Sequence, residues 1–187
     1  MKYDNSPVSI NDLKEVQELL FKTTYQRWMD DVLFSFNWWF LVVISILPWF
    51  IWWKLTDKTR LLEIIVVGFA VFGIATLLDV IGIVFSLWTY GYKIIQMFPP
   101  LTPVDMTALP IIYMLIYQWF SKWKTFLIAH VIMAAISTFI FEPLFAWMDI
   151  YVLHGWKYIY SFPIYIAMAA GVKWFVQKVI AIQDKKR

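Results

Sequence analysis

Five long apolar segments, separated by short polar connectors, dominate the chain from residue 33 onward. A helix needs about 20 apolar residues to cross the hydrocarbon core of a bilayer. The segments are Leu33–Trp53, Leu61–Trp88, a stretch that begins after a proline cluster and ends at about Phe120, about Thr125 to Trp147, and about Ser161 to Ile182. We therefore predict an all-α integral membrane bundle of five transmembrane helices that forms a single domain over residues 33–187.

The second of these segments is longer than a bilayer requires. A continuous helix over Leu61–Trp88 would measure about 42 Å, whereas the hydrocarbon core is about 30 Å thick. We expect this helix to tilt strongly, to bend near Gly82 or to project beyond the lipid.

Residues 1–32 have a different pattern and form the predicted N-terminal unit. Between residues 10 and 29, apolar residues recur at helical spacing with charged residues between them, and Ser9 stands before the run as a candidate N-cap. Such a segment is too polar to span a membrane. We predict an amphipathic N-terminal helix that lies at the membrane interface or against the bundle.

The basic residues predict the orientation of the bundle, because short loops rich in Lys and Arg stay in the cytoplasm. With the N-terminus outside and the C-terminus inside, the outer connectors carry only Lys93 and Lys157. The inner segments then hold Lys54, Lys58, Arg60, Lys122, Lys124, Lys173, Lys178, Lys185, Lys186 and Arg187. This asymmetry favours an N-out, C-in topology.

Composition supports the membrane assignment and excludes several classes of function. Apolar residues make up 61% of the 187 residues and charged residues only 16%, a balance unlike that of soluble domains. The net charge of +3 sits at the ends of apolar runs, so we expect no nucleic-acid partner. The chain contains no cysteine, no glycine-rich phosphate loop and no histidine cluster with metal-ligand spacing, so we predict neither a cofactor nor a metal.

The stretch 97–110, MFPPLTPVDMTALP, combines four prolines with a single carboxylate. Thr102 can cap the third span, Pro103 can occupy its first helical position, and Asp105 can reach back to the capping residue, which is the spacing of a capping box. Helix initiation is therefore one explanation for Asp105.

Depth in the membrane suggests a second explanation. In the predicted topology Asp79, Asp105 and Glu142 come from three different spans and reach a similar depth near the outer face. Ionisable groups within spans are costly and indicate a functional site by default. His154, Lys157 and Tyr158 are candidate partners at the same level. These six residues form the candidate binding site, with a structural ion-pair network as the alternative.

Other polar and aromatic residues have structural explanations. Trp88 and Trp156 lie near the outer ends of their spans, as interfacial anchors do. Arg60 and Glu63 have the spacing of a helix-surface ion pair. His130 is expected to be a hydrogen-bonded packing residue in the fourth span.

Several motifs resemble those of a known group of proteins. The stretches are DVIGIVFSLWTY, PPLTPVDMTALPIIYMLIYQWF, FEPLFAWMDIY and WKYIYSFPIYI. In combination they resemble an uncharacterised family of small multipass membrane proteins from spore-forming Gram-positive bacteria, over most of the chain from about residue 33. The resemblance implies a location in the bacterial plasma membrane and supplies no activity.

A looser similarity is to the membrane-embedded carotenoid (lycopene) cyclases, which place acidic residues beside prolines in a helical bundle. Their motif has proline before the acids, whereas here Glu142 precedes Pro143. We therefore carry over no catalytic residue from that family.

These observations predict a polytopic membrane protein whose polar pocket in the outer leaflet binds a membrane lipid, a small apolar ligand, or a partner subunit that is either a second copy or another membrane protein. One alternative is an intramembrane acid/base enzyme of the cyclase or isomerase type that acts on an apolar, isoprenoid-like substrate. A further alternative is a proton-coupled transporter, which requires a polar path through both leaflets.

Overall fold

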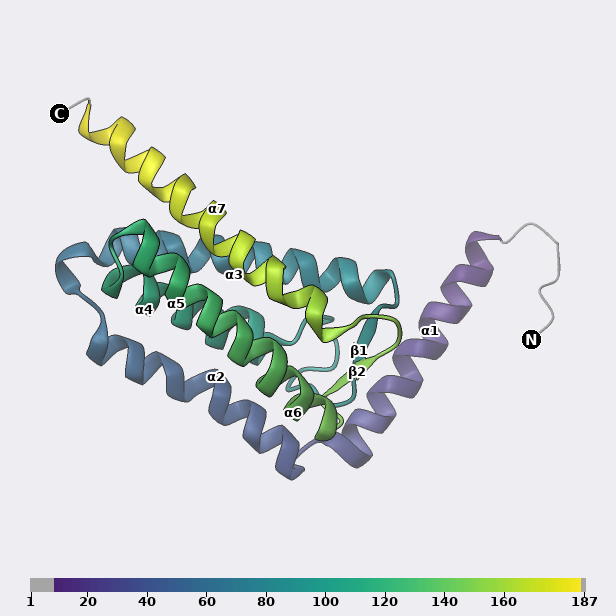
Figure 1. The fold of residues 1–187 in the computed structure, drawn as a ribbon. Coiled ribbons are helices and arrows are strands. Elements are labelled where there is room, and N and C mark those ends of the chain that lie inside the picture. The colour runs from purple at the N-terminus through teal and green to yellow at the C-terminus, as the bar shows by residue number, and fades with distance from the viewer. Residues whose placement is uncertain (1–8, 186–187) are drawn as a thin grey trace.

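The computed structural model describes residues 9–185 and shows a mostly helical chain (Figure 1). The first eight residues of the predicted N-terminal unit, together with Lys186 and Arg187, lie outside the described residues. The α-helices are α1 (Ile10–Arg27), α2 (Phe36–Leu55), α3 (Leu61–Val84), α4 (Leu109–Trp119), α5 (Trp123–Ile136), α6 (Glu142–Trp147) and α7 (Tyr158–Asp184). Short helical turns are η1 (Trp28–Val32), η2 (Lys58–Arg60), η3 (Val104–Ala108) and η4 (Ser137–Phe141).

Within residues 9–185, four helices are long and apolar enough to cross a membrane. They are Phe36–Leu55, Lys58–Val84, Trp123–Trp147 and Tyr158–Gln183, and they correspond to the first, second, fourth and fifth predicted segments. The second helix ends at Val84, so the prediction that it continues to Trp88 is wrong, and the chain turns instead through Ser86 at a φ of 53°.

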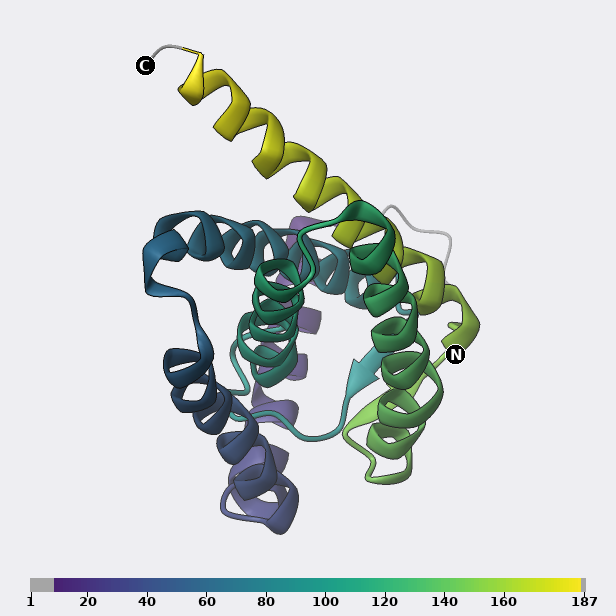
Figure 2. The same cartoon turned by 60° about the vertical axis from the view of Figure 1, so that its left-hand side comes forward.

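The third predicted segment folds as η3 followed by α4 and is not one of these four helices. It occupies the middle of the bundle, with α2, α3 and α5 around it (Figure 2). Tyr113, Met114 and Tyr117 on α4 are at most 3% exposed. With only 11 residues, α4 is much shorter than the four helices long enough to cross a membrane.

A small sheet departs from the all-α prediction. Strands β1 (Trp88–Tyr90) and β2 (Tyr151–Leu153) pair antiparallel, with Thr89 opposite Val152. They belong to the connectors after α3 and α6, which are 60 residues apart in the chain but meet at one end of the bundle (Figure 1). The sheet ties these two connectors together.

The N-terminal helix begins as predicted and then leaves the bundle. Asp12 N donates to Ser9 Oγ at 3.2 Å and Ser9 N donates to Asp12 Oδ2 at 2.7 Å, which completes a capping box. Helix α1 buries none of its side chains. Its far end is attached by Arg27 Nη1, which donates to Gly91 O at 3.1 Å, and by Trp28 Nε1, which donates to Lys93 O at 2.9 Å.

The two ends of the bundle differ in chemistry. We call the end with β1 and β2 the sheet end, and the end with η2 and the connector 120–122 the basic end (Figure 1). The start of α1 and the end of α7 point away from the bundle at opposite ends. The basic end holds Lys54, Lys58, Arg60, Lys122 and Lys124.

Candidate functional site

A cavity of about 480 Å³ lies between α2, α3, α4, α6 and α7. Most of its wall is apolar, and typical wall residues are Ile44, Leu78, Ile112, Phe145 and Met168. The polar groups of the wall gather toward the sheet end, where they include all three carboxyl groups predicted from the sequence, Asp79, Asp105 and Glu142. The described lining contains no Lys, Arg or His.

Asp79, near the C-terminal end of α3, is the most fully hydrogen-bonded of the three. Its Oδ1 accepts from Trp88 Nε1 at 2.7 Å and from Tyr90 Oη at 2.5 Å, and its Oδ2 accepts from the backbone N–H of Leu101 at 3.0 Å. The side chain is 6% exposed. An ionised carboxylate has acceptor sites only, so three converging donors match its chemistry.

A glycine makes this arrangement possible. Gly82 lies three residues after Asp79, on the same face of α3. A Cβ placed on Gly82 would overlap the indole ring of Trp88. The absence of a side chain therefore lets the ring lie against the helix and present its N–H to Asp79.

Asp105, in η3, lies beside Asp79 and is 6% exposed. Among the described residues no side chain caps the start of η3, so the predicted capping box between Thr102 and Asp105 is wrong. The backbone of this turn is held in another way, because Asp105 N donates to Leu101 O at 3.0 Å while Asp79 accepts the Leu101 amide. Within residues 9–185, Asp105 Oδ2 is buried without a hydrogen-bond partner.

Glu142 is bound on another wall of the cavity by hydroxyl groups of α7. Its Oε2 accepts from Ser161 Oγ at 3.1 Å and its Oε1 accepts from Tyr165 Oη at 2.9 Å. Trp156 Nε1 donates to Ser161 Oγ at 3.0 Å, which extends the network toward the sheet. Pro143 follows directly and lies in the first turn of α6, where proline is tolerated.

Aromatic rings close the polar end of the cavity. The rings of Tyr90 and Tyr151, which are opposite one another in the sheet, stack at 5.8 Å, and the Trp88 and Trp156 rings meet edge-on at 5.1 Å. Burial, with the nearby Asp79 carboxylate, raises the pKa of Tyr90 well above its usual value. Burial and the nearby Glu142 carboxylate raise the pKa of Tyr151 in the same direction. Both hydroxyls therefore stay protonated and can donate hydrogen bonds.

The other three predicted site residues lie outside this cavity lining. His154 is exposed, and its Nε2 lies 2.9 Å from Thr89 Oγ1 across the sheet. Lys157 is exposed at the N-cap position of α7, and Tyr158 is the next residue. Lys93 is also turned away, since its Nζ donates to Gln96 O and Phe98 O, and burial lowers its pKa.

The structure adds residues that the sequence did not assign to the site. Trp88 and Trp156 were predicted to be interfacial anchors, yet both line the cavity and donate hydrogen bonds inside it. Ser161 and Tyr165 join them as partners of Glu142. Their four-residue spacing, which places both on one face of a helix, was a usable signal.

Ion pairs and metals play no visible part at this end. Within residues 9–185 the salt bridges are Lys14–Glu18 and Arg60–Glu63, so the three cavity carboxyl groups are held by neutral donors or left unpaired. In the same part of the chain, no group of three His, Asp or Glu side chains is arranged to hold a metal ion.

Comparison with known proteins assigns no relative. No protein-family model matches the chain. No curated protein and no solved structure matches it either. The site must therefore be interpreted from its own chemistry.

Proposed function

We propose that this chain is a polytopic membrane protein that binds, in the sheet-end cavity, an apolar molecule carrying a cationic or hydrogen-bond-donating group. The observation that carries the proposal is that Asp79, Asp105 and Glu142 all line one largely apolar cavity of about 480 Å³. That volume falls in the usual range for small-molecule sites, which combine apolar walls with a few convergent polar groups.

The charge of the cavity lining determines which polar group a ligand can carry. The described lining offers carboxyl groups and aromatic hydroxyls without a cation, so an anionic head group would meet like charge in a dry site. Both oxygens of Asp79 accept hydrogen bonds, whereas within residues 9–185 Asp105 Oδ2 has no partner. An amine or hydroxyl group of a ligand would supply the missing donor to Asp105.

The proposed membrane arrangement places this cavity in the outer half of a bacterial plasma membrane. We propose that η3 with α4 crosses as the third of five spans, with the N-terminus outside and the C-terminus inside. The clustering of Lys54, Lys58, Arg60, Lys122 and Lys124 at the basic end supports this orientation. The exposed apolar residues of α1 support its placement along the outer interface, as for amphipathic helices in general.

A binding experiment tests the proposal. The full-length protein in phosphatidylcholine nanodiscs is offered dodecylamine or dodecanoate, which share a chain and differ in charge, and bound molecules are counted by native mass spectrometry. At the site that Glu142→Gln disrupts, we expect dodecylamine to bind about tenfold or more tightly than dodecanoate, since a buried charged partner contributes at least this much.

Variants locate the binding. Glu142→Gln is expected to weaken dodecylamine binding, whereas the control Asp31→Asn, which removes an exposed carboxylate outside the cavity, leaves it unchanged. Equal affinity of both probes for the site that depends on Glu142, or equal loss in Asp31→Asn, would contradict the proposal. Mass spectrometry of the gently purified protein then identifies any retained natural molecule.

An intramembrane acid/base enzyme is the second candidate. It is favoured by the different environments of the carboxyl groups, because Glu142 is held by two hydroxyls whereas Asp105 lies beside a second carboxyl group. Such a difference lets one group act as acid while another acts as base. Incubation with a C20 or C40 isoprenoid followed by mass and double-bond analysis tests it, and unchanged substrate with all three carboxyl groups intact rejects it.

A proton-coupled transporter is the third candidate, on the strength of one residue. His130 in α5 is fully buried, with Nδ1 at 3.1 Å from Phe126 O and Nε2 unpartnered within residues 9–185. His130 lies on α5 between the cavity residue Ser137 and the basic end, so a proton path from the cavity to the basic end could pass it. The expected packing role of His130 explains its contacts with Tyr113 and Phe126 equally well.

A further inference from the structure

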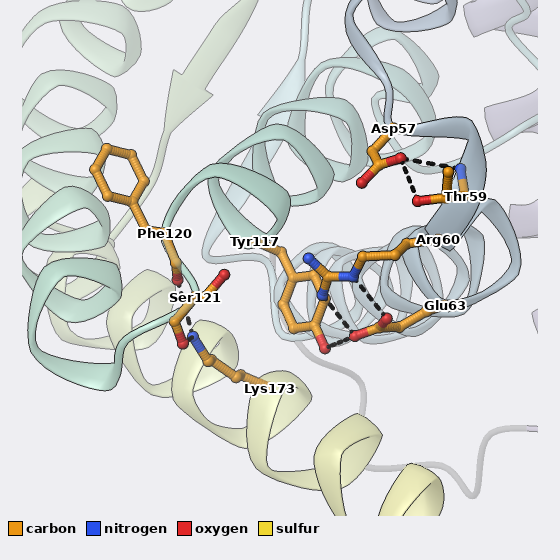
Figure 3. A network of polar contacts seen from close by, with 8 residues as sticks. All are labelled: Asp57, Thr59, Arg60, Glu63, Tyr117, Phe120, Ser121 and Lys173. Atoms are coloured by element: carbon orange, nitrogen blue, oxygen red, sulfur yellow. Dashed lines mark hydrogen bonds and ion pairs between the residues drawn. The ribbon is translucent and has the colours of Figure 1, made fainter.

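A second cavity lies at the basic end, far from the carboxyl groups of the first. Its volume is about 300 Å³, and its charged lining residues are Arg60, Glu63 and Lys173. Tyr117, Ser121 and Gln177 complete its polar wall, and Figure 3 shows all of these side chains except Gln177. The residues come from η2 and the start of α3, from the end of α4 and the connector after it, and from the second half of α7.

Glu63 is neutralised within this cluster. Arg60 Nε donates to Glu63 Oε2 at 3.0 Å and Arg60 Nη2 donates to Glu63 Oε1 at 2.8 Å, as the sequence spacing predicted. Tyr117 Oη also donates to Glu63 Oε1. Both carboxylate oxygens are therefore occupied, while the guanidinium still has N–H groups that this carboxylate does not use.

Lys173 supplies a second cation that has no carboxylate partner among the described residues. Its side chain is only 1% exposed, and its Nζ donates to Phe120 O at 3.0 Å and to Ser121 O at 2.9 Å. Phe120 and Ser121 follow the last residue of α4, and the C-terminal end of a helix favours a nearby cation. An ammonium group has three donors, so one is not used by these carbonyls. Nζ also lies 4.1 Å from the centroid of the Phe126 ring, a cation–π contact that a ligand anion would compete with.

Arg60 and Lys173 both line this cavity. Each also lies near the Tyr117 ring, with Arg60 Cζ at 5.6 Å and Lys173 Nζ at 5.7 Å from the ring centroid. After Glu63 is counted, the wall carries one net positive charge, with the side chains of Ser121 and Gln177 as neutral hydrogen-bonding groups. Anions with several acceptor oxygens match a guanidinium edge together with an ammonium donor.

The surroundings favour a lipid as the carrier of that anion. Helix α7 continues about 16 Å beyond Lys173, and Figure 1 shows it projecting past the rest of the bundle. Its exposed side chains there include Trp174, Phe175, Val179 and Ile182. Trp119, Trp123 and Trp174 near the cavity are exposed as well, as interfacial tryptophans are. A head group can therefore enter the cavity while its acyl chains run along the bundle toward the sheet end.

We infer that the cavity at the basic end binds the phosphate group of an anionic membrane lipid through Arg60 and Lys173. This site is independent of the proposed ligand site at the sheet end, with which it shares no lining residue. Its chemistry is also the opposite, because it offers cations where the first cavity offers carboxyl groups.

The test uses three probes on the delipidated full-length protein in neutral detergent. Dioleoylphosphatidylglycerol carries both phosphate and acyl chains, dioleoylglycerol carries the chains alone, and inorganic phosphate carries the anion alone. Binding is measured by native mass spectrometry and by the shift of the unfolding temperature. We expect phosphatidylglycerol to bind and dioleoylglycerol to bind at least about tenfold more weakly.

Inorganic phosphate identifies the source of the anion. If it competes with phosphatidylglycerol, the phosphate contact is supported and a soluble phosphate is also a ligand. If it fails to compete while phosphatidylglycerol binds, the acyl chains contribute and the site is a lipid site. Equal binding of phosphatidylglycerol and dioleoylglycerol would overturn the inference.

Charge-matched variants separate a built site from general attraction to a basic surface. Arg60→Gln with Glu63→Gln removes a guanidinium without changing the net charge, and Lys178→Gln removes one exposed charge from α7 outside the cavity. We expect the double variant to weaken phosphatidylglycerol binding about tenfold and Lys178→Gln to change it by less than about twofold. The reverse pattern would overturn the inference.

Discussion

Replacing Asp79 and Asp105 by asparagine, one at a time, is expected to give opposite results although both carboxyl groups are 6% exposed and lie together. An asparagine at 79 has only one acceptor oxygen. If that oxygen keeps Trp88 Nε1 and Tyr90 Oη, its NH₂ group faces the Leu101 amide and leaves this buried donor unpaired. An unpaired buried donor costs about 1–3 kcal/mol, and loss of charge assistance weakens each remaining bond by about 1 kcal/mol.

Release of a buried charge offsets part of this cost, so we expect Asp79→Asn to lower the free energy of unfolding by about 2–4 kcal/mol. Asp105 Oδ2 has no partner within residues 9–185, so the amide oxygen of an asparagine can take its place without losing a hydrogen bond. The NH₂ group then lies at the other oxygen position, beside Asp79, and can donate to the Asp79 carboxylate. Asp105→Asn is therefore expected to change stability by less than about 1 kcal/mol or to increase it.

The assay is reversible unfolding in mixed micelles with increasing sodium dodecyl sulfate, followed by far-ultraviolet circular dichroism. Asp31→Asn is the control, because Asp31 is an exposed carboxylate near the sheet end. A loss in Asp105→Asn as large as that in Asp79→Asn would refute the reasoning, since it would mean that both carboxyl groups carry equivalent structural hydrogen bonds.

Three further expectations concern the same end of the bundle and the orientation of the chain. Gly82→Ala should destabilise the protein by about 1–3 kcal/mol through overlap with Trp88, whereas Gly73→Ala, where no atom lies within 4 Å of the new Cβ, should be neutral or stabilising by up to about 1 kcal/mol. Trp88→Phe should keep the ring contact but remove a donor to Asp79, at a cost of about 1–3 kcal/mol in the same unfolding assay; no loss would show that this hydrogen bond is unimportant. Because the chain has no cysteine, a single Lys157→Cys should react with a membrane-impermeant maleimide in intact cells and Lys58→Cys should not, and the reverse result would invert the proposed topology.

Hydrophobic patterning was sufficient to predict most of the helices, because bilayer length and the 3.6-residue repeat constrain the sequence directly. Residue type and spacing also predicted the Ser9 cap and the pairing of Arg60 with Glu63, because both depend on residues three positions apart. The small sheet was not predictable in this way. Its strands have three residues each, and their pairing joins Thr89 to Val152 across the whole of α4 and α5.

The convergence of the carboxyl groups could be anticipated because helix length sets depth, and Asp79, Asp105 and Glu142 do line one cavity. Their partners could not be anticipated by the same argument. Depth in the membrane alone favoured Lys157 and His154 as partners of the carboxyl groups. The side of α3 on which Asp79 lies, and the path of the connector after α3, bring Trp88 and Tyr90 to Asp79 instead.

Neutral partners change what the sheet-end cavity can do. A carboxylate paired with Lys or Arg would have its charge cancelled by the protein, and a ligand cation would have to displace that partner. Here Glu142 is held by Ser161 and Tyr165, which donate hydrogen bonds and carry no positive charge. A cationic or donor group that enters the cavity therefore meets a carboxyl group that is oriented and has no cationic partner in the described lining. The cavity at the basic end is lined instead by the cations Arg60 and Lys173. The separation of the two charges along one bundle predicts that amphiphiles of opposite head-group charge bind at opposite ends.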